Sequence, residues 1–331
     1  MITPAMLVLA GLSFANSPWA QPVDLPTSPA APAVAKIAPA ADTTLSAAAA
    51  VRAPSPQFSF SVVASGLNQP VGIAVHGGGT LYFTEVPTPG VPGPMGGMNS
   101  VKTLDLESGD ITTLSAGEPE PLNIAIIQQG RPAWTCRTAG VILTIDEMGD
   151  RVPLLTGLMR PTGIAMNRDA LYFTQIPTPA VPGPMGGTNT TNSYDGSTIQ
   201  TLTTGEPEPY DIAVSRDGTT YWTCRSAGVI LTRSPEGAVQ LVLGSLSAPT
   251  GIALDEVGGA LYFTEVPTPG VPGSAGGMNT VNRIDLATGT REVLNAGDPQ
   301  PTDIAVARNG RIYWTCTSAG VIVEGRRTRG R

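Results

Sequence analysis

Short apolar runs, interrupted at regular intervals by turn residues, fill the chain from about residue 58 onward. One phrase, proline followed two residues later by Gly, Asn or Asp and then by Ile-Ala, occurs six times, with its isoleucine at positions 73, 124, 164, 212, 252 and 304. Successive copies are therefore 51, 40, 48, 40 and 52 residues apart. Self-similarity at such a period is typical of repeat architectures. The alternation of spacings further predicts that odd and even copies differ in the length of one loop.

Each copy carries the same order of strand signals. After the phrase comes a turn, such as Asn309-Gly310, a dipeptide that tolerates the positive φ of tight hairpins. A run rich in aromatic and β-branched residues follows, such as Leu81–Thr84, and two further short strands such as Val141–Ile145 and Val152–Leu155 end the copy. Four antiparallel strands in about 45 residues make one propeller blade. The sequence therefore predicts an all-β fold, a six-bladed β-propeller with four antiparallel strands per blade.

The two ends of the repeat region predict how the ring closes. The last copy stops after Val321–Val323 without a fourth strand. The missing strand is found at the other end, where Phe58–Gly66 resembles the outer strands around Leu154 and Leu241. We expect the N-terminal strand to join the last blade, which removes an open sheet edge.

Composition divides the rest of the chain. Residues 1–20 contain the apolar stretch Ala5–Ala15 and small residues suited to cleavage, which predicts a signal peptide, although a disordered apolar tail is the alternative. Residues 21–57 are rich in Ala and Pro and are expected to form a disordered linker. The propeller is predicted over 58–325, with a basic tail at 326–331. We therefore expect export to the periplasm or the extracellular space, and no membrane span, because no run of 18 apolar residues occurs.

Charge narrows the class of partner. The net charge is −7, and the chain has two lysines among its 331 residues. Such a balance argues against nucleic acid or an anionic membrane as partner. A protein or a small cationic or polar ligand is the expected partner, bound to a monomer.

Blade topology places the unusual residues on one rim, where inner strands begin and second strands end. Odd copies carry long loops there, Pro87–Met98, Pro177–Gly187 and Pro267–Gly277, in which prolines lower the cost of ordering and glycines allow close approach. These loops either form walls for a ligand or simply cap the ring. The predicted binding rim consists of these loops and of the following residues: Glu85, Gln175, Glu265, Glu118, Glu120, Glu206, Glu208, Asp298, Arg137, Arg225, Met95 and Met185.

Three oxygen-bearing residues stand near the start of the even inner strands. These are Asn123, Asp211 and Asp303, where the odd strands have glycine. Side chains that point toward the axis from alternate blades can share one hard cation such as Ca²⁺, with water completing its shell. Alternatively, each carboxylate accepts backbone N–H groups and braces the neighbouring blade.

Other repeated positions have structural explanations. Cys136, Cys224 and Cys316 occupy one blade position too far apart for a disulfide or one zinc ion, so we expect partly buried free thiols. Three phenylalanines and three tryptophans alternate at another position and are expected to fill the core between blades. The threonine after each aromatic suits a repeated hydrogen bond between strands. This set comprises Phe83, Phe173, Phe263, Trp134, Trp222, Trp314, Thr84, Thr135, Thr174, Thr223, Thr264 and Thr315.

The blade phrase, with Leu-Tyr-Phe-Thr-Glu or Tyr-Trp-Thr-Cys after its turn, resembles the blades of NHL and YWTD-type propellers, and also those of streptogramin-lyase-like proteins. The resemblance covers about Phe58 to Glu324 and implies the fold rather than a function. Streptogramin-type lyases use a rim histidine, whereas His76 is expected on the opposite rim. Gluconolactonase-like propellers carry Asn or Asp before the blade glycine, where this chain has Val71, Thr162 and Thr250.

Two functions follow. We favour an exported, non-catalytic propeller that binds a ligand or partner protein at the rim of Pro/Gly loops and acidic connections. The alternative is a metal-dependent hydrolase or lyase with its cation at Asn123, Asp211 and Asp303, and with Glu120 or Glu208 as the base.

Overall fold

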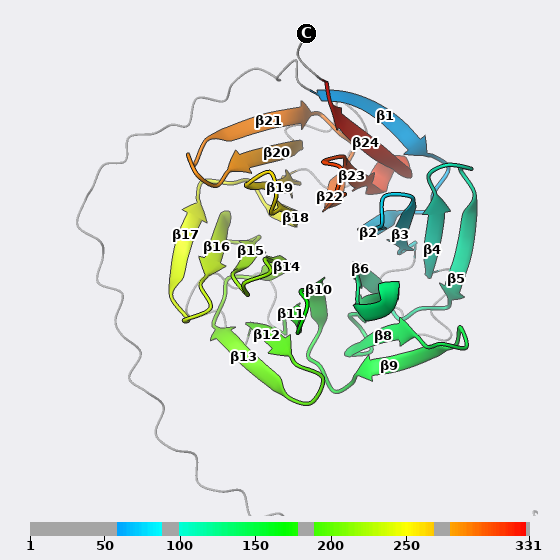
Figure 1. Ribbon diagram of the computed structural model, residues 1–331, viewed down its shortest axis with the longest axis horizontal. Coiled ribbons are helices and arrows are strands. Elements are labelled where there is room, and N and C mark those ends of the chain that lie inside the picture. Colours follow the sequence, from blue (N-terminus) through cyan, green and yellow to red (C-terminus); the bar gives the residue numbers. More distant parts are fainter. Residues whose placement is uncertain (1–57, 88–98, 178–188, 268–278, 329–331) are drawn as a thin grey trace, which may run out of the picture. The chain divides into compact units, whose positions relative to one another are not determined.

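The computed structural model describes residues 58–87, 99–177, 189–267 and 279–328. These residues form six four-stranded antiparallel sheets, which Figure 1 shows arranged in a ring around a central axis. The predicted six-bladed β-propeller is therefore confirmed. No helix in these ranges is long and apolar enough to cross a membrane.

The first three blades each take four consecutive strands, from the axis outward. Blade one contains β2 (Pro70–His76), β3 (Thr80–Glu85), β4 (Ser100–Asp105) and β5 (Ile111–Ala116). Blade two contains β6 (Pro121–Ile126), β7 (Pro132–Cys136), β8 (Val141–Ile145) and β9 (Arg151–Leu155), with the 3-10 turn η1 (Gln128–Gly130) in its first hairpin. Blade three contains β10 (Pro161–Met166), β11 (Leu171–Gln175), β12 (Thr190–Tyr194) and β13 (Ile199–Thr204).

The next two blades repeat this order, and the sixth borrows its outer strand. Blade four contains β14 (Pro209–Val214), β15 (Thr220–Cys224), β16 (Val229–Arg233) and β17 (Val239–Leu243). Blade five contains β18 (Pro249–Asp255), β19 (Ala260–Glu265), β20 (Thr280–Asp285) and β21 (Arg291–Ala296). Blade six contains β22 (Pro301–Val306), β23 (Ile312–Cys316), the 3-10 turn η4 (Thr317–Ala319), β24 (Val321–Arg327) and the N-terminal β1 (Phe58–Ala64).

Strand β1 closes the ring as the sequence predicts. It pairs antiparallel with β24 from Phe58 opposite Arg327 to Ala64 opposite Ile322. The seam between blades six and one is reinforced on the inner side, where the hydroxyl of Thr315 donates to the carbonyl of Val71 over 2.6 Å. Strand β24 reaches Arg327, so the first residues of the predicted basic tail belong to the sheet.

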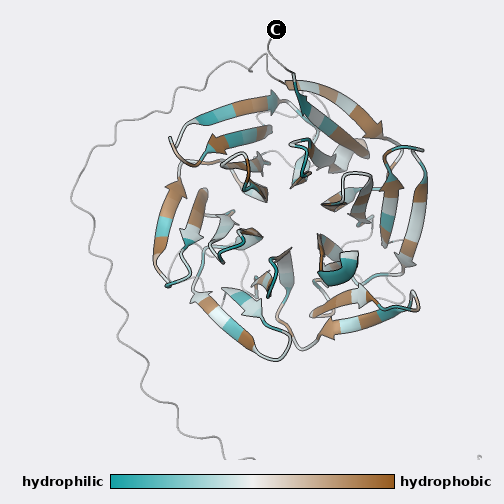
Figure 2. Ribbon diagram, in the orientation of Figure 1, coloured by the Kyte–Doolittle hydropathy of each residue, from teal (hydrophilic) through white to brown (hydrophobic). Residues whose placement is uncertain are grey.

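The core lies between neighbouring blades. The six predicted aromatic residues have no exposed surface, and the clusters around them combine side chains from two adjacent blades. Figure 2 shows hydrophobic and hydrophilic residues alternating along the outer strands, whose two faces meet different surroundings.

The repeated threonine links each blade to the next. In blade two the hydroxyl of Thr135 accepts the amide N–H of Asn123 at 3.1 Å and donates to the carbonyl of Thr162 in blade three at 2.7 Å. Blade four repeats this arrangement through Thr223, which donates to Thr250. The predicted hydrogen bond therefore exists, and it joins blades as well as strands.

Odd-blade glycines allow neighbouring inner strands to approach closely. A β-carbon at Gly163 would lie 2.6 Å from the Cα of Asp211, and one at Gly251 would lie 2.6 Å from the Cα of Asp303. These distances leave no space for any side chain. Packing therefore requires glycine at these positions of the odd blades, opposite the aspartates of the even blades.

Candidate binding site at the connection rim

The ring has two different rims. We call the side on which inner strands begin the connection rim, because the segments that join blades lie there, among them Gly117–Pro121 and Gly205–Pro209. We call the other side the hairpin rim, because the turns between inner and second strands lie there, including the turn around Arg308. His76 ends β2 and so lies at the hairpin rim, away from the predicted binding residues.

Three side chains meet on the axis, just inside the connection rim. The amide Nδ2 of Asn123 donates to Oδ1 of Asp211 over 2.8 Å, and Asp303 borders the same small space as these two residues. The two aspartates are buried. The structure therefore brings together the three residues that the sequence singles out, although they come from three different blades.

The two carboxylates are clamps between blades. Asp211 accepts the N–H of Ile252 in blade five through Oδ2, at 2.8 Å. Asp303 accepts the N–H of Ile73 in blade one, also at 2.8 Å. Each also accepts the N–H of the residue that follows it, at 2.7 and 2.8 Å respectively. These contacts match the alternative in which each carboxylate accepts backbone N–H groups and braces the neighbouring blade.

A hard cation fits this arrangement poorly. Ca²⁺ takes six to eight oxygen ligands in proteins, whereas here both oxygens of each aspartate already accept backbone N–H groups and Asn123 presents an N–H donor to Asp211. Within the part of the chain that the structure describes, no three His, Cys, Asp or Glu side chains lie close enough together to hold a metal.

Burial changes the protonation of this pair. Loss of hydration and the nearby Asp303 raise the pKa of Asp211 well above its usual value. Loss of hydration likewise raises the pKa of Asp303 to about 7. Both carboxyl groups therefore take up a proton at a higher pH than an exposed aspartate does.

The axial cluster separates two spaces in the channel. Toward the hairpin rim lies a cavity of about 260 Å³, lined by the inner strands. Toward the connection rim only about 10 Å³ is free, and Tyr210 and Leu122 border it. Burial raises the pKa of Tyr210. Sequence reasoning missed Tyr210. A signal was present, since Tyr210 is larger than Leu122 and Thr302, which hold the matching positions in the other even blades.

The acidic connections point partly into the protein. The carboxylate of Glu118 accepts the indole N–H of Trp134 at 3.0 Å and pairs with Arg151 at 2.8 Å. Glu206 accepts from Trp222 at 3.1 Å, and Asp298 accepts from Trp314 at 2.8 Å. Each of these carboxylates therefore holds a core tryptophan in place.

The three cysteines sit beside these carboxylates as free, fully buried thiols. We expected partial burial, and the structure shows complete burial. Each thiol packs beside a tryptophan and the carboxylate that this tryptophan binds. Cys136 lies 3.6 Å from Glu118. Burial, and then the nearby acid, raises the pKa of all three thiols far above the ordinary value.

The odd-blade residues at the end of the second strand hold the preceding connection. Glu85 accepts the N–H of Asn68 at 2.8 Å and pairs with Lys102 at 2.7 Å. Gln175 accepts the N–H of Met159. Glu265 accepts the N–H of Ser247 at 2.7 Å and pairs with Arg291.

The remaining predicted residues form a polar surface around Tyr210. Arg137 pairs with Glu120 at 3.5 Å, and Arg225 pairs with Glu208 at 4.0 Å. The Arg225 guanidinium also lies 5.4 Å from the centre of the Tyr210 ring. The arginine side chains are 28% and 33% exposed. We call these five residues the connection-rim patch.

Met95, Met185 and most of the three Pro/Gly loops lie outside the described residues.

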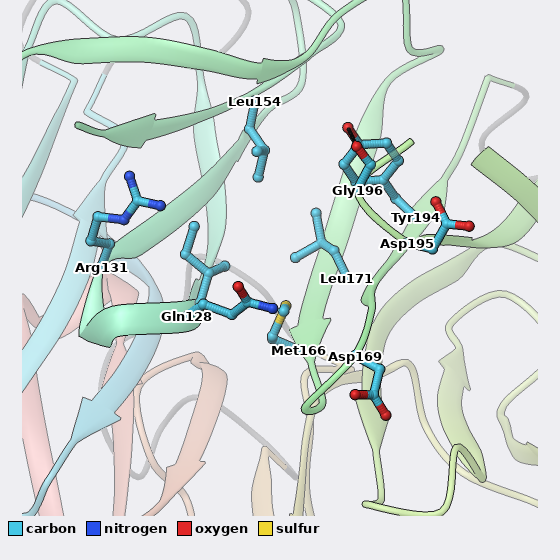
Figure 3. A pocket seen from close by; sticks show the side chains of 10 residues that line it. Gln128, Arg131, Leu154, Met166, Asp169, Leu171, Tyr194, Asp195 and Gly196 are labelled. Carbon is cyan, nitrogen blue, oxygen red and sulfur yellow. Dashed lines mark hydrogen bonds between the residues drawn. The ribbon is translucent and has the colours of Figure 1, made fainter. Parts of the chain in front are cut away.

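A separate cavity of about 140 Å³ opens between blades two and three, at the hairpin rim. Figure 3 shows Leu154 and Leu171 facing one another across it, with the amide of Gln128 near Met166. Of the predicted site residues that the structure describes, none lines this cavity.

Comparisons with known proteins agree with this architecture. No protein-family model matches the chain. It is 27% identical over 278 residues to low-density lipoprotein receptor-related protein 1 of Pyricularia oryzae, covering 72% of this chain and 85% of that protein.

Solved structures of similar fold include proteins whose titles name enzymes and a calcium-binding protein. A streptogramin B lyase matches with 18% identity and a TM-score of 0.56, covering 82% of this chain and 98% of the lyase. A gluconolactonase from Xanthomonas campestris matches with 16% identity and a TM-score of 0.63, covering 81% and 89%. The calcium-binding protein regucalcin from Agrobacterium tumefaciens matches with 16% identity and a TM-score of 0.62, covering 83% and 96%. At these identities the likeness concerns the fold alone, and the chain is a six-bladed β-propeller.

Proposed function

We propose that this propeller is an exported, non-catalytic binding module that takes a protein segment or a small polar ligand at the connection-rim patch. In this proposal residues 1–20 act as a signal peptide and residues 21–57 as a linker, and the propeller works in the periplasm or outside the cell.

The arrangement of charges at the connection rim carries the proposal. Two partly exposed arginines stand beside two glutamates, with ion-pair distances of 3.5 and 4.0 Å, around one tyrosine. The glutamate side chains are only 7% and 12% exposed, whereas the arginine side chains reach solvent at 28% and 33%. Arginine and tyrosine are the residue types that most often anchor interfaces. The remaining acidic candidates already hold tryptophan or backbone N–H groups of their own chain, so they support the fold.

The proposal can be tested by selection of binders from a random peptide library displayed on phage, with the whole propeller as bait. We expect the selected peptides to lose at least about tenfold in affinity for an Arg225→Gln/Tyr210→Ala variant. A variant on the opposite rim, Arg168→Gln, is the matched control and should keep full affinity. Selected peptides that bind all three proteins equally would show that the connection-rim patch is not the binding surface.

The rival function is a metal-dependent hydrolase or lyase, and two observations support it as a second candidate. Asn123, Asp211 and Asp303 do meet on the axis, and propellers of similar fold include a gluconolactonase and the calcium-binding regucalcin. A cation at this place would have to displace backbone N–H groups from the two carboxylates. It would also bind better as the pH rises and the two carboxyl groups ionise.

Thermal unfolding with Ca²⁺ or with a chelator separates the two functions. For a clamp without metal, we expect the midpoint at pH 8 to agree between millimolar Ca²⁺ and EDTA. A rise of several degrees with Ca²⁺ that is absent in an Asp211→Asn variant would support the metal site. It would also contradict our assignment of this cluster as a clamp.

A further inference from the structure

The hairpin rim carries a basic groove that the connection-rim function does not use. It has a volume of about 500 Å³ and lies between blades five and six, whose inner strands β18 and β22 are neighbours in the ring (Figure 1). It is bordered by two hairpins and by the end of β24. The lining includes Asp255, Val257, Gly258, the turn Arg308–Arg311, Arg326 and Arg327.

The charge of this groove is opposite to that of the protein. Four arginines and one acid, Asp255, line it, while Glu256 beside Asp255 pairs with Arg216, and the whole chain has a net charge of −7. Turns elsewhere on the hairpin rim are acidic, for example those at Asp105, Asp146 and Asp195. The groove is therefore a local positive site within an acidic rim.

Two of the arginines are held in position from below. Glu324 is 1% exposed, and its carboxylate pairs with Arg326 at 2.6 Å and with Arg311 at 3.2 Å. The hydroxyl of Tyr313 donates to the same carboxylate at 2.9 Å. One buried acid thus orients two guanidinium groups and neutralises only one of the two charges. Arginines fixed in this way lose little rotamer freedom when they bind an anion.

A third arginine stands out against its counterparts in other blades. Arg168, Arg216 and Arg308 occupy equivalent positions in the first hairpins of blades three, four and six. The first two are followed by Asp169 and Asp217, and Arg216 also pairs with Glu256 at 3.1 Å. Arg308 is exposed and followed by Asn309, and it has no acidic partner among the residues that the structure describes. Its guanidinium donors are available to a ligand.

We propose that this groove binds a small multiply charged oxyanion, either a phosphate or a di- or tricarboxylate. A volume of this size falls in the range of small-molecule sites. Guanidinium groups match carboxylate and phosphate oxygens with paired N–H donors. Arg308 supplies free donors, while Arg311 and Arg326 supply charges that Glu324 holds in place.

Calorimetric titration of the full-length protein with citrate and with inorganic phosphate, each at low and high salt, tests the proposal. We expect saturable binding of at least one of the two, weakened at high salt because the contacts are electrostatic. An Arg308→Gln variant should bind roughly tenfold or more weakly, since hydrogen bonds to charged groups are lost. Arg168→Gln changes the equivalent hairpin arginine and should bind as the unmodified protein does.

The outcomes separate the sources of binding. Stronger binding of citrate indicates a carboxylate ligand, and stronger binding of phosphate indicates a phosphorylated one. No saturable binding, or equal loss in the Arg168→Gln variant, overturns the proposal. Sedimentation analysis covers the remaining case, because salt-sensitive self-association that disappears with Arg308→Gln would assign the groove to the acidic turns of a second copy and would also overturn it. A matching unfolding midpoint for all variants shows that the fold is intact.

Discussion

The sharpest prediction concerns Asp303, whose carboxylate joins the two ends of the ring. It accepts the N–H of Ile73, 230 residues away in the chain, at 2.8 Å and the N–H of Ile304 at 2.8 Å. In an Asp303→Asn variant the amide oxygen can serve Ile304, as the oxygen of Asn123 serves Ile124. The amide nitrogen would then face the N–H of Ile73, donor against donor. A stranded buried donor costs about 1–3 kcal/mol of unfolding free energy.

The pH dependence makes this prediction specific. The pKa of Asp303 rises from 3.8 to about 7 on folding, so the folded state binds more protons than the unfolded state between about pH 4 and pH 7. The free energy of unfolding contributed by this group therefore falls as pH rises through that window, by up to about 4 kcal/mol in total at 1.36 kcal/mol per pKa unit. Asp303→Asn removes this loss. The variant should be less stable than the unmodified protein at pH 5, and the difference should shrink or reverse at pH 8.

The assay is urea unfolding at pH 5, 6, 7 and 8, followed by the fluorescence of the buried tryptophans. Asp217→Asn is the control, because Asp217 is an exposed turn carboxylate whose pKa is lowered by the hydroxyl of Ser215 and the N–H of Thr219. Its effect lies below the tested window and should not vary across it. A constant difference between Asp303→Asn and the unmodified protein from pH 5 to pH 8 would refute the raised pKa of Asp303.

Two further predictions follow from burial and close packing. Gly251→Ala should lower the free energy of unfolding by about 1–3 kcal/mol or more, because its β-carbon would lie 2.6 Å from the Cα of Asp303. Gly244→Ala, where the nearest atom lies 3.8 Å away, should have little effect in the same urea titration, and similar losses for both glycines would contradict the packing argument. The thiols of Cys136, Cys224 and Cys316 should react with a disulfide reagent only as fast as the protein unfolds, since burial raises their pKa and removes them from solvent. Fast reaction in the absence of urea, measured by absorbance, would show that the pockets of these thiols open in the native state.

The repeat itself could be predicted because it rests on local patterns. The phrase around Ile73 and its five copies marks each inner strand, and turns such as Asn309-Gly310 mark the hairpins. Ring closure was predictable for the same reason, because Phe58–Ala64 carries the pattern of an outer strand and the last copy lacks one. The inter-blade positions of the aromatic residues and threonines followed from their places in the repeat.

The chemistry of the candidate site could not be read in this way. Which groups Asp211 and Asp303 contact depends on distances across the axis between blades that are far apart in the chain, and Tyr210 borders the same small space. Likewise Glu118 and Glu120 flank one proline but point in different directions. Glu118 accepts the indole N–H of Trp134, and Glu120 pairs with Arg137 at the rim.

The sequence by itself determined the number of blades, the strand order, the alternation of odd and even blades and the strand that closes the ring, because periodic apolar positions and turn residues act over short stretches of chain. Only the tertiary structure decided that the axial carboxylates clamp blades, and that Arg308, Arg311 and Arg326 gather into one basic groove. These arrangements depend on contacts between residues from different strands and blades, and no local pattern carries that information.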